Sequence, residues 1–299
     1  MQQTGAGAEA RNSASAVKPS FAVRRISDVA GGEFTGIDLS RPIDAATRDA
    51  ILDAFLEYHV LVFRDQDVSG DEQLAFTQNF GEIEGHVVRD FSGKAVPKMH
   101  IISNLDADGN PTSRPYTSGN YYWHTDKSYH AVPSLMTLLH AKELPPEGGG
   151  TQFCNMYLSY AALPEARRRE LAGLQVVHSW EANRRNTGHE PPTEAEKRER
   201  PPVTHPLIRT HPDTGRKLLY IGIHTSHVVG MPEAEGRALL EELIDYATKP
   251  EYVYSHSWRA GDFVMWDNRC LVHRGVKDYD MDAHRRVLHR TVVRGTAPY

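Results

Sequence analysis

The 299-residue chain has little of what would assign it to a specialised class of protein. Its two cysteines, Cys154 and Cys270, are too few for a disulfide framework. Its formal net charge of −5 indicates no basic surface for nucleic acid. No apolar run approaches the roughly 18 residues of a membrane span, and the N-terminus lacks the apolar core of a signal peptide. We therefore expect a cytoplasmic protein without nucleic-acid or membrane partners.

Residues 1–20 are rich in alanine, glycine and serine, which predicts a disordered tail before a single domain at 21–299. Within that domain, strand-like segments alternate with a few amphipathic helices. Strands are predicted at 21–25, 36–39, 60–63 and 285–294, and helices at 44–58, 70–79, 164–173 and 233–247. The pattern predicts a mainly β chain, a jelly-roll core with peripheral helices.

Two long polar segments interrupt these elements. Residues 183–202 are rich in charge and proline, and we interpret most of this segment as a surface loop. Residues 106–120 run directly into the histidine at position 124, so this loop is also a candidate to contact a substrate.

The most informative pattern is His124 and Asp126, separated by one residue. Side chains of a strand alternate between its faces, so these two would point the same way and reach one ion. With His273 they supply two imidazoles and one carboxylate, the ligand set of non-haem Fe(II) oxygenases. The same residues also suit a hydrolytic zinc centre. Taken alone, His-x-Asp is often just a hydrogen-bonded pair. Cys270, three residues before His273, is expected on the other face, packed in the core.

Two further motifs carry charge or hydroxyl groups. Arg286 and Arg290 share one face of the predicted strand 285–294, and a guanidinium matches a carboxylate with two parallel hydrogen bonds. On charge alone a solvated basic strand edge is the better explanation; beside a metal, the pair indicates sites for two small carboxylates. The glycines 148–150 before Thr151 lack the lysine of a phosphate-binding loop.

Together these motifs resemble the taurine/2,4-dichlorophenoxyacetate dioxygenase family of Fe(II)/2-oxoglutarate oxygenases. The segments that carry the resemblance are 123–126, 142–151, 209–217, 266–269 with His273, and Arg286 with Arg290. They span roughly residues 21–296 in the family's order. Residues 215–230 and 264–270 are more similar to the aryloxyalkanoate branch than to the taurine branch. The resemblance implies a double-stranded β-helix, the cupin-like jelly roll, and we expect a homo-oligomer.

The resemblance also implies roles for the matching residues. Fe(II) would be bound by His124, Asp126 and His273. The distal carboxylate of 2-oxoglutarate would be held by Thr151 and Arg286. The prime substrate would be bound by Arg290, Asn120 and His86. The segment 276–283 is longer than in the taurine enzyme, so Arg285 is an alternative to Arg286.

The implied reaction consumes O2 and hydroxylates an aliphatic C–H bond of a small anionic substrate. Where that carbon bears an ether oxygen, as in an aryloxyalkanoate, the product collapses and the ether is cleaved. A sulfonate, an alkyl sulfate or an amino-acid derivative is an alternative substrate for the same chemistry. A zinc hydrolase and a non-catalytic binder of a small acid are the alternatives from other classes.

Overall fold

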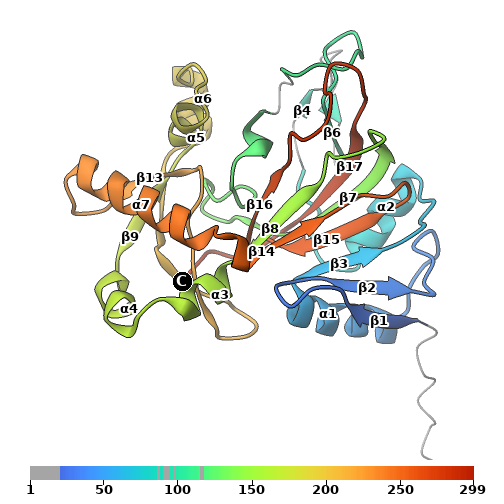
Figure 1. Cartoon of the computed structure of the whole chain (residues 1–299), viewed down its shortest axis with the longest axis horizontal. Helices are drawn as coiled ribbons and strands as arrows, with labels where there is room; N and C mark the ends of the chain where they lie inside the picture. Colours follow the sequence, from blue (N-terminus) through green and yellow to red (C-terminus); the bar gives the residue numbers. More distant parts are fainter. Residues whose placement is uncertain (1–20, 86–87, 90–94, 97–98, 115–117) are drawn as a thin grey trace, which may run out of the picture.

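The computed structural model describes residues 21–85, 88–89, 95–96, 99–114 and 118–299. The predicted disordered tail at 1–20 and the candidate substrate residue His86 lie outside the described residues. Strands form the framework of the described part, and helices lie around it (Figure 1). The expectation of a mainly β chain with peripheral helices is confirmed.

The largest sheet has seven strands. In spatial order they are β1 (Ala22–Arg25), β2 (Gly32–Thr35), β3 (Val60–Phe63), β15 (Phe263–Asp267), β7 (Ser134–Glu143), β17 (Val287–Arg294) and β6 (His100–Ser103). Neighbours are antiparallel except β2 and β3, which run parallel. Strands from both ends of the sequence therefore lie side by side, and the last long strand, β17, lies between β7 and β6 (Figure 1).

A second sheet carries the other half of the candidate site. Its strands are β14 (Val253–His256), β8 (Thr151–Asn155) and β16 (Leu271–Gly275). Smaller sheets are formed by β10 (Val203–Pro206), β9 (Gln175–His178) and β13 (Thr225–Val228), by β11 (Ile208–Thr210) with β12 (Lys217–Leu219), and by β4 (Val88–Arg89) with β5 (Ala95–Val96).

Side-chain alternation divides the apolar residues of the large sheet between two cores. Val60 and Val62 of β3 belong to a core shared with Phe153 of the second sheet. Leu61 and Phe63 of the same strand belong to a core shared with the helices on the other face. Because both faces are covered, β3 is apolar at every position, as a strand buried on both sides requires.

The helices lie outside the sheets. They are α1 (Ala45–Tyr58), α2 (Gly70–Gln78), α3 (Met156–Ala162), α4 (Glu165–Leu171), α5 (Trp180–Asn186), α6 (Glu194–Glu199) and α7 (Glu233–Ala247), with 3-10 turns η1 (Ser118–Tyr121) and η2 (Pro250–Tyr252). The helices predicted at 44–58, 70–79, 164–173 and 233–247 correspond to α1, α2, α4 and α7. Asp44 caps α1 by accepting the Thr47 N–H at 2.8 Å. In the described residues, none of the helices is long and apolar enough to span a bilayer.

Two predictions about these elements are wrong. The strand expected at 36–39 lies earlier, as β2, because Gly36 has a φ of +82° and ends the extended backbone. The segment 183–202 is not mainly loop, since α5 ends at Asn186 and α6 occupies Glu194–Glu199. A capping box begins α6, in which Thr193 and Glu196 bond each other's backbone N–H groups. That spacing was readable in the sequence.

Candidate metal and cosubstrate site

His124 and His273 are brought together by a short backbone pairing. The His124 N–H donates to the His273 carbonyl at 3.1 Å, and the His273 N–H donates to the His124 carbonyl at 2.7 Å. The expectation of a regular strand through Asp126 is not met, because this single bridge is followed by a turn in which Lys127 has a φ of +56°. The bridge and the turn nevertheless direct His124 and Asp126 towards the same point.

The three predicted ligands form a buried cluster. One ligand atom from each of His124, Asp126 and His273 lies within 4.8 Å of the others. Nε2 of His124 is 3.9 Å from Oδ1 of Asp126. Nδ1 of His124 is 2.7 Å from the carbonyl of Tyr122 and must donate to it, which leaves Nε2 without a proton and free to bind a metal.

The protonation of the cluster also suits a divalent cation. Burial lowers the pKa of both His124 and His273, which keeps them neutral with a lone pair available. Burial alone raises the pKa of Asp126, but the positive charge of Arg290, with smaller effects of the neighbouring histidines His273 and His124 and of the Thr137 hydroxyl, outweighs it and the pKa is lowered. Two neutral imidazoles and a carboxylate are therefore present, and this donor set fits Fe(II).

Arg286 and Thr151 lie next to one another beside this cluster. Nε of Arg286 donates to the Gly149 carbonyl at 2.7 Å, and its NH2 group is 3.4 Å from Oγ1 of Thr151. Gly149 has a φ of +65°, and a Cβ there would lie 3.2 Å from Nε of Arg286, so the glycine permits this approach. Arg285 instead points outward and pairs with Glu143 at 2.6 Å.

Arg290 lies on β17, which Arg286 immediately precedes, and it contacts the candidate ligand Asp126. Its NH1 group is 3.3 Å from Oδ1 of Asp126, and its NH2 group is 3.4 Å from Nδ1 of His100. A small void of about 40 Å³ connects the two arginines with Asn120 and His273. The period-two prediction for β17 therefore places both guanidinium groups correctly, and Asn120 of η1 is at the same void.

Comparison with known proteins gives the same assignment. Residues 22–292 match the family described as "Taurine catabolism dioxygenase TauD, TfdA family". The chain belongs to this dioxygenase family. The expectation of a TauD/TfdA member is thereby confirmed over nearly all of the described residues.

Individual relatives of this dioxygenase come from the aryloxyalkanoate branch. It is 42% identical over 242 residues, 78% of this chain and 81% of the relative, to the alpha-ketoglutarate-dependent 2,4-dichlorophenoxyacetate dioxygenase of Burkholderia sp. (strain RASC). It is 34% identical to the (S)-phenoxypropionate/alpha-ketoglutarate-dioxygenase of Sphingobium herbicidovorans, covering 92% of this chain and 96% of that protein. The crystal structure of AAD-2 with Mn(II) and N-oxalylglycine superimposes with a TM-score of 0.83 at 36% identity, over 93% of this chain and 98% of that one.

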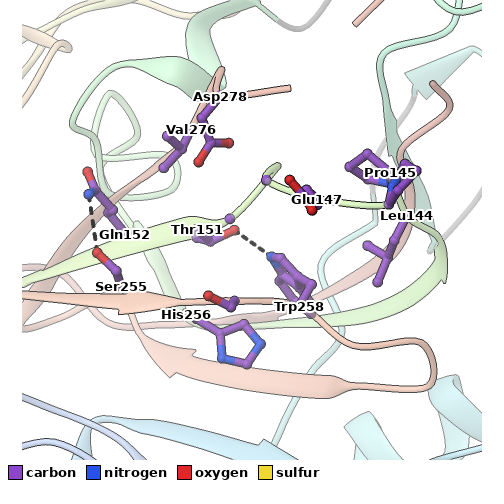
Figure 2. Close-up of a pocket in the computed structure, with 14 residues that line it drawn as sticks. Leu144, Pro145, Glu147, Thr151, Gln152, Ser255, His256, Trp258, Val276 and Asp278 are labelled. Carbon is purple, nitrogen blue, oxygen red and sulfur yellow. Dashed lines mark hydrogen bonds between the residues drawn. The ribbon is translucent and has the colours of Figure 1, made fainter. Parts of the chain in front are cut away.

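A larger cavity of the dioxygenase is lined by Thr151 but by none of the three candidate metal ligands (Figure 2). Its volume is about 390 Å³, and the side chains of Glu147, His256 and Asp278 line it. Nε1 of Trp258 donates to Oγ1 of Thr151 at 3.0 Å at its wall. The lining includes two carboxylates and neither lysine nor arginine, so the cavity does not suit a dicarboxylate cosubstrate.

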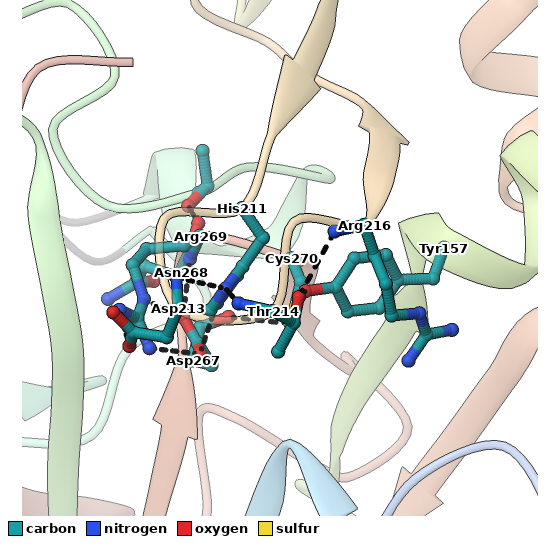
Figure 3. Close-up of polar contacts among 10 residues, drawn as sticks. Tyr157, His211, Asp213, Thr214, Arg216, Asp267, Asn268, Arg269 and Cys270 are labelled. Atoms are coloured by element: carbon teal, nitrogen blue, oxygen red, sulfur yellow. Dashed lines mark hydrogen bonds and ion pairs between the residues drawn. The ribbon is translucent and has the colours of Figure 1, made fainter. Parts of the chain in front are cut away.

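A second buried cluster contains His211, Asp267 and Cys270 (Figure 3). Its atoms already have partners. Arg269 donates to both oxygens of Asp267, at 2.8 and 2.7 Å, and His211 Nε2 is 3.1 Å from Oδ2. Nδ1 of His211 accepts the backbone N–H groups of Asp213 and Thr214. The cluster is therefore a hydrogen-bonded part of the core. Cys270 is buried in that core and does not belong to the group of His124, Asp126 and His273, as predicted.

Two side chains that contact the candidate ligand Asp126 were not predicted from the sequence. Thr137 on β7 donates to Oδ2 of Asp126 at 2.5 Å, and Asn268 after β15 accepts the Asp126 N–H at 3.3 Å. The segment 266–269 was recognised as a motif of the family, but nothing in the spacing assigned Asn268 to Asp126.

Proposed function

We propose that this dioxygenase, which uses Fe(II), 2-oxoglutarate and O2, hydroxylates the carbon next to the ether oxygen of an aryloxyalkanoate and so cleaves the ether. The observation that carries the proposal is Arg290, a guanidinium 3.3 Å from a metal ligand and on the same strand face as Arg286. One dicarboxylate needs only one of the two arginines at its distal end. The second is available for an anionic substrate.

Each residue then has one task. His124, Asp126 and His273 would hold Fe(II), and Arg286 with Thr151 would bind the distal carboxylate of 2-oxoglutarate. Bound iron, with 2-oxoglutarate and O2, supplies the oxidant for the C–H bond. Arg290, with Asn120 beside it, would bind the carboxylate of the substrate and thereby orient the carbon to be oxidised. The proposed substrate role of His86 rests on the family resemblance alone.

Binding would require more room than the void of about 40 Å³ that the described residues leave at this site. Arg290 is held there by Oδ1 of Asp126, the oxygen that faces His124. A cation at that oxygen would take the place of the guanidinium, and Arg290 would turn towards the incoming anion. Ile102, Leu139 and Leu288 line the same void, and they favour an apolar body behind the charged group.

The framework is proposed to be the jelly roll of the family, a double-stranded β-helix within one domain at 21–299. Its support is that the seven-stranded sheet and the β14-β8-β16 sheet share one apolar core. His273 of β16 in the second sheet and Arg286, which immediately precedes β17 of the large sheet, line the same small void. The homo-oligomer expected from the sequence stays a prediction.

A sulfate ester is the second candidate substrate, because an arginine binds sulfate as it binds a carboxylate. The alkylsulfatase of Acinetobacter baylyi is 31% identical to this chain, covering 90% of this chain and 84% of that protein.

A substrate panel tests the proposal. Succinate release would be measured with phenoxyacetate, both enantiomers of 2-phenoxypropionate, taurine and hexyl sulfate, each with Fe(II) and 2-oxoglutarate. We expect release above the substrate-free rate with the aryloxyalkanoates, together with the free phenol. Succinate release with hexyl sulfate alone would favour the sulfate ester and contradict the aryloxyalkanoate.

A further inference from the structure

We propose that Asn268 and Thr137 are positioning residues that fix which oxygen of Asp126 faces the metal. The inference rests on the proposed function, in which Asp126 is a ligand of Fe(II). Neither residue would touch the metal or the substrate. They form a directed chain of hydrogen bonds that begins at the indole of Trp266 and ends on the Asp126 carboxylate.

The chain begins at a group that can only donate. Nε1 of Trp266 is 3.1 Å from the side-chain oxygen of Asn268, and an indole N–H has no acceptor capacity. The Asp126 N–H donates to the same oxygen at 3.3 Å. Two donors therefore require the oxygen, and not the nitrogen, of the Asn268 amide at this position. These two hydrogen bonds fix the orientation of the Asn268 amide whether or not a metal is bound.

The fixed amide then orders the hydroxyl of Thr137. Nδ2 of Asn268 lies 2.9 Å from Oγ1 of Thr137 and must donate to it. The hydroxyl has a single proton, which is left for Oδ2 of Asp126 at 2.5 Å. Oδ2 is thereby held in a hydrogen bond, and Oδ1 is the oxygen directed towards Nε2 of His124. The carboxylate would offer the metal one oxygen.

The turn that carries Asn268 is itself anchored on both sides. The Thr125 hydroxyl donates to the Asn268 carbonyl at 2.6 Å, and the Asn268 N–H donates to the Leu135 carbonyl at 2.9 Å. The preceding residue, Asp267, accepts two hydrogen bonds from Arg269 in the buried cluster of Figure 3. Asn268 is 1% exposed and Thr137 is 0% exposed, so water does not compete for these bonds.

The indole also reaches the second histidine. The Trp266 ring is 4.7 Å from the ring of His273, centroid to centroid. One residue therefore contacts His273 directly and Asp126 through the hydrogen-bond chain. Loss of such outer contacts typically costs 10–100-fold in metal affinity.

The test compares Thr137→Val with Thr137→Ser in the full-length enzyme, using Co(II) as the probe. Valine keeps the shape of threonine and removes the hydroxyl, whereas serine keeps the hydroxyl. Thr291→Val is the matched control, because Thr291 is also 0% exposed and its hydroxyl bonds Thr77 at 2.8 Å, outside this chain of bonds. The Co(II) dissociation constant and the visible spectrum of bound Co(II) would be measured alongside the melting temperature.

We expect Thr137→Val to raise the Co(II) dissociation constant by about 10–100-fold. We also expect it to alter the Co(II) spectrum, because Oδ2 of Asp126 loses its hydrogen bond and both carboxylate oxygens can then bind Co(II). Thr137→Ser and Thr291→Val should retain wild-type affinity and spectrum. Equal affinity and equal spectra for Thr137→Val and Thr291→Val would overturn the proposal.

A second variant covers the case in which Thr137→Val does not fold. Trp266→Phe keeps an aromatic ring beside His273 and removes the N–H that orients Asn268. It should weaken Co(II) binding by about tenfold, and unchanged binding would overturn the proposal. A wild-type enzyme that binds no Co(II) would instead contradict the proposed function, so the two failures are distinguishable.

Discussion

Arg290 and Asp126 form an ion pair inside the candidate metal site, with NH1 of Arg290 3.3 Å from Oδ1 of Asp126. The side chains are 15% and 9% exposed, so the pair is largely removed from water. The guanidinium lowers the pKa of Asp126 and keeps the ligand ionised. The same oxygen faces His124, so a bound metal and Arg290 compete for it. This competition is the reason to expect that Arg290 needs a new anionic partner once the metal binds.

Replacing Arg290 by alanine tests the anion site. A charge-assisted hydrogen bond contributes roughly 1.5–3 kcal/mol, so we expect the KM of an aryloxyacetate to rise about ten- to a hundredfold. The dissociation constant of 2-oxoglutarate should change little. The methyl ester of the substrate is the control, because it should be a poor substrate of the wild type and nearly unaffected by the substitution. Equal turnover of acid and ester by the wild type would mean that Arg290 serves only as the partner of Asp126.

Arg286→Gln and Arg285→Gln are a matched pair for the cosubstrate site. Arg286 is buried against Gly149 and Thr151, whereas the Arg285 side chain is 45% exposed and pairs with Glu143. We expect Arg286→Gln to weaken 2-oxoglutarate binding about ten- to a hundredfold. Arg285→Gln should bind it as the wild type does. Anaerobic titration of 2-oxoglutarate would measure both, and the opposite ranking would contradict the assignment of Arg286.

The metal-free protein should lose stability as the pH falls from 7 to 4. Burial lowers the pKa of His59 to about 4 and that of His224 to about 3, whereas the ordinary value is 6.5. Below about pH 6.5 the unfolded chain binds protons that the folded protein does not. Each histidine therefore reduces the free energy of unfolding by up to about 1.4 kcal/mol per pH unit until its folded pKa is reached.

Urea unfolding at pH 7, 6 and 5 would measure this slope. His59→Asn is the control, since asparagine tolerates the left-handed backbone of position 59, where φ is +63°. The variant should show a shallower pH dependence than the wild type. A free energy of unfolding that does not change between pH 7 and pH 5 would be incompatible with neutral buried histidines.

Cys270→Ala tests whether the second buried cluster, which contains Cys270, binds a metal. The cysteine belongs to the cluster of His211 and Asp267, whose polar atoms are already paired. We expect the variant to lose about 1 kcal/mol of stability from the lost buried sulfur and to bind one equivalent of Co(II) with wild-type affinity. Binding of two equivalents by the wild type, falling to one in the variant, would show that this cluster is a second metal site.

The clustering of the candidate ligands could be predicted because it depends on local spacing. The spacing of His124 and Asp126 and the period-two alignment of Arg286 with Arg290 require only short stretches of backbone. His124 and Asp126 converge on one point as predicted, but a single bridge to His273 and the turn at Lys127 replace the expected regular strand. The same local rules predicted α1 and α7 but placed a strand at 36–39, where Gly36 ends β2 instead.

The residues that support the ligands could not be predicted in this way. Thr137 is on β7 and Asp126 is in a turn before it, and Asn268 reaches Thr137 because β15 and β7 are neighbours in the sheet. Strand order and register are set by packing of the whole chain, not by any short pattern. The ion pair of Arg290 with Asp126 likewise joins a residue of β17 to a turn far away in the sequence.

We propose that His124, Asp126 and His273 bind the Fe(II) on which 2-oxoglutarate is activated. The most direct test of this claim is the visible absorption of the wild type and of Asp126→Ala after anaerobic addition of Fe(II) and 2-oxoglutarate. We predict a weak charge-transfer band for the wild type, and for Asp126→Ala neither this band nor substrate hydroxylation, with the fold retained by circular dichroism. No band from the wild type, or equal bands from both proteins, would contradict the claim.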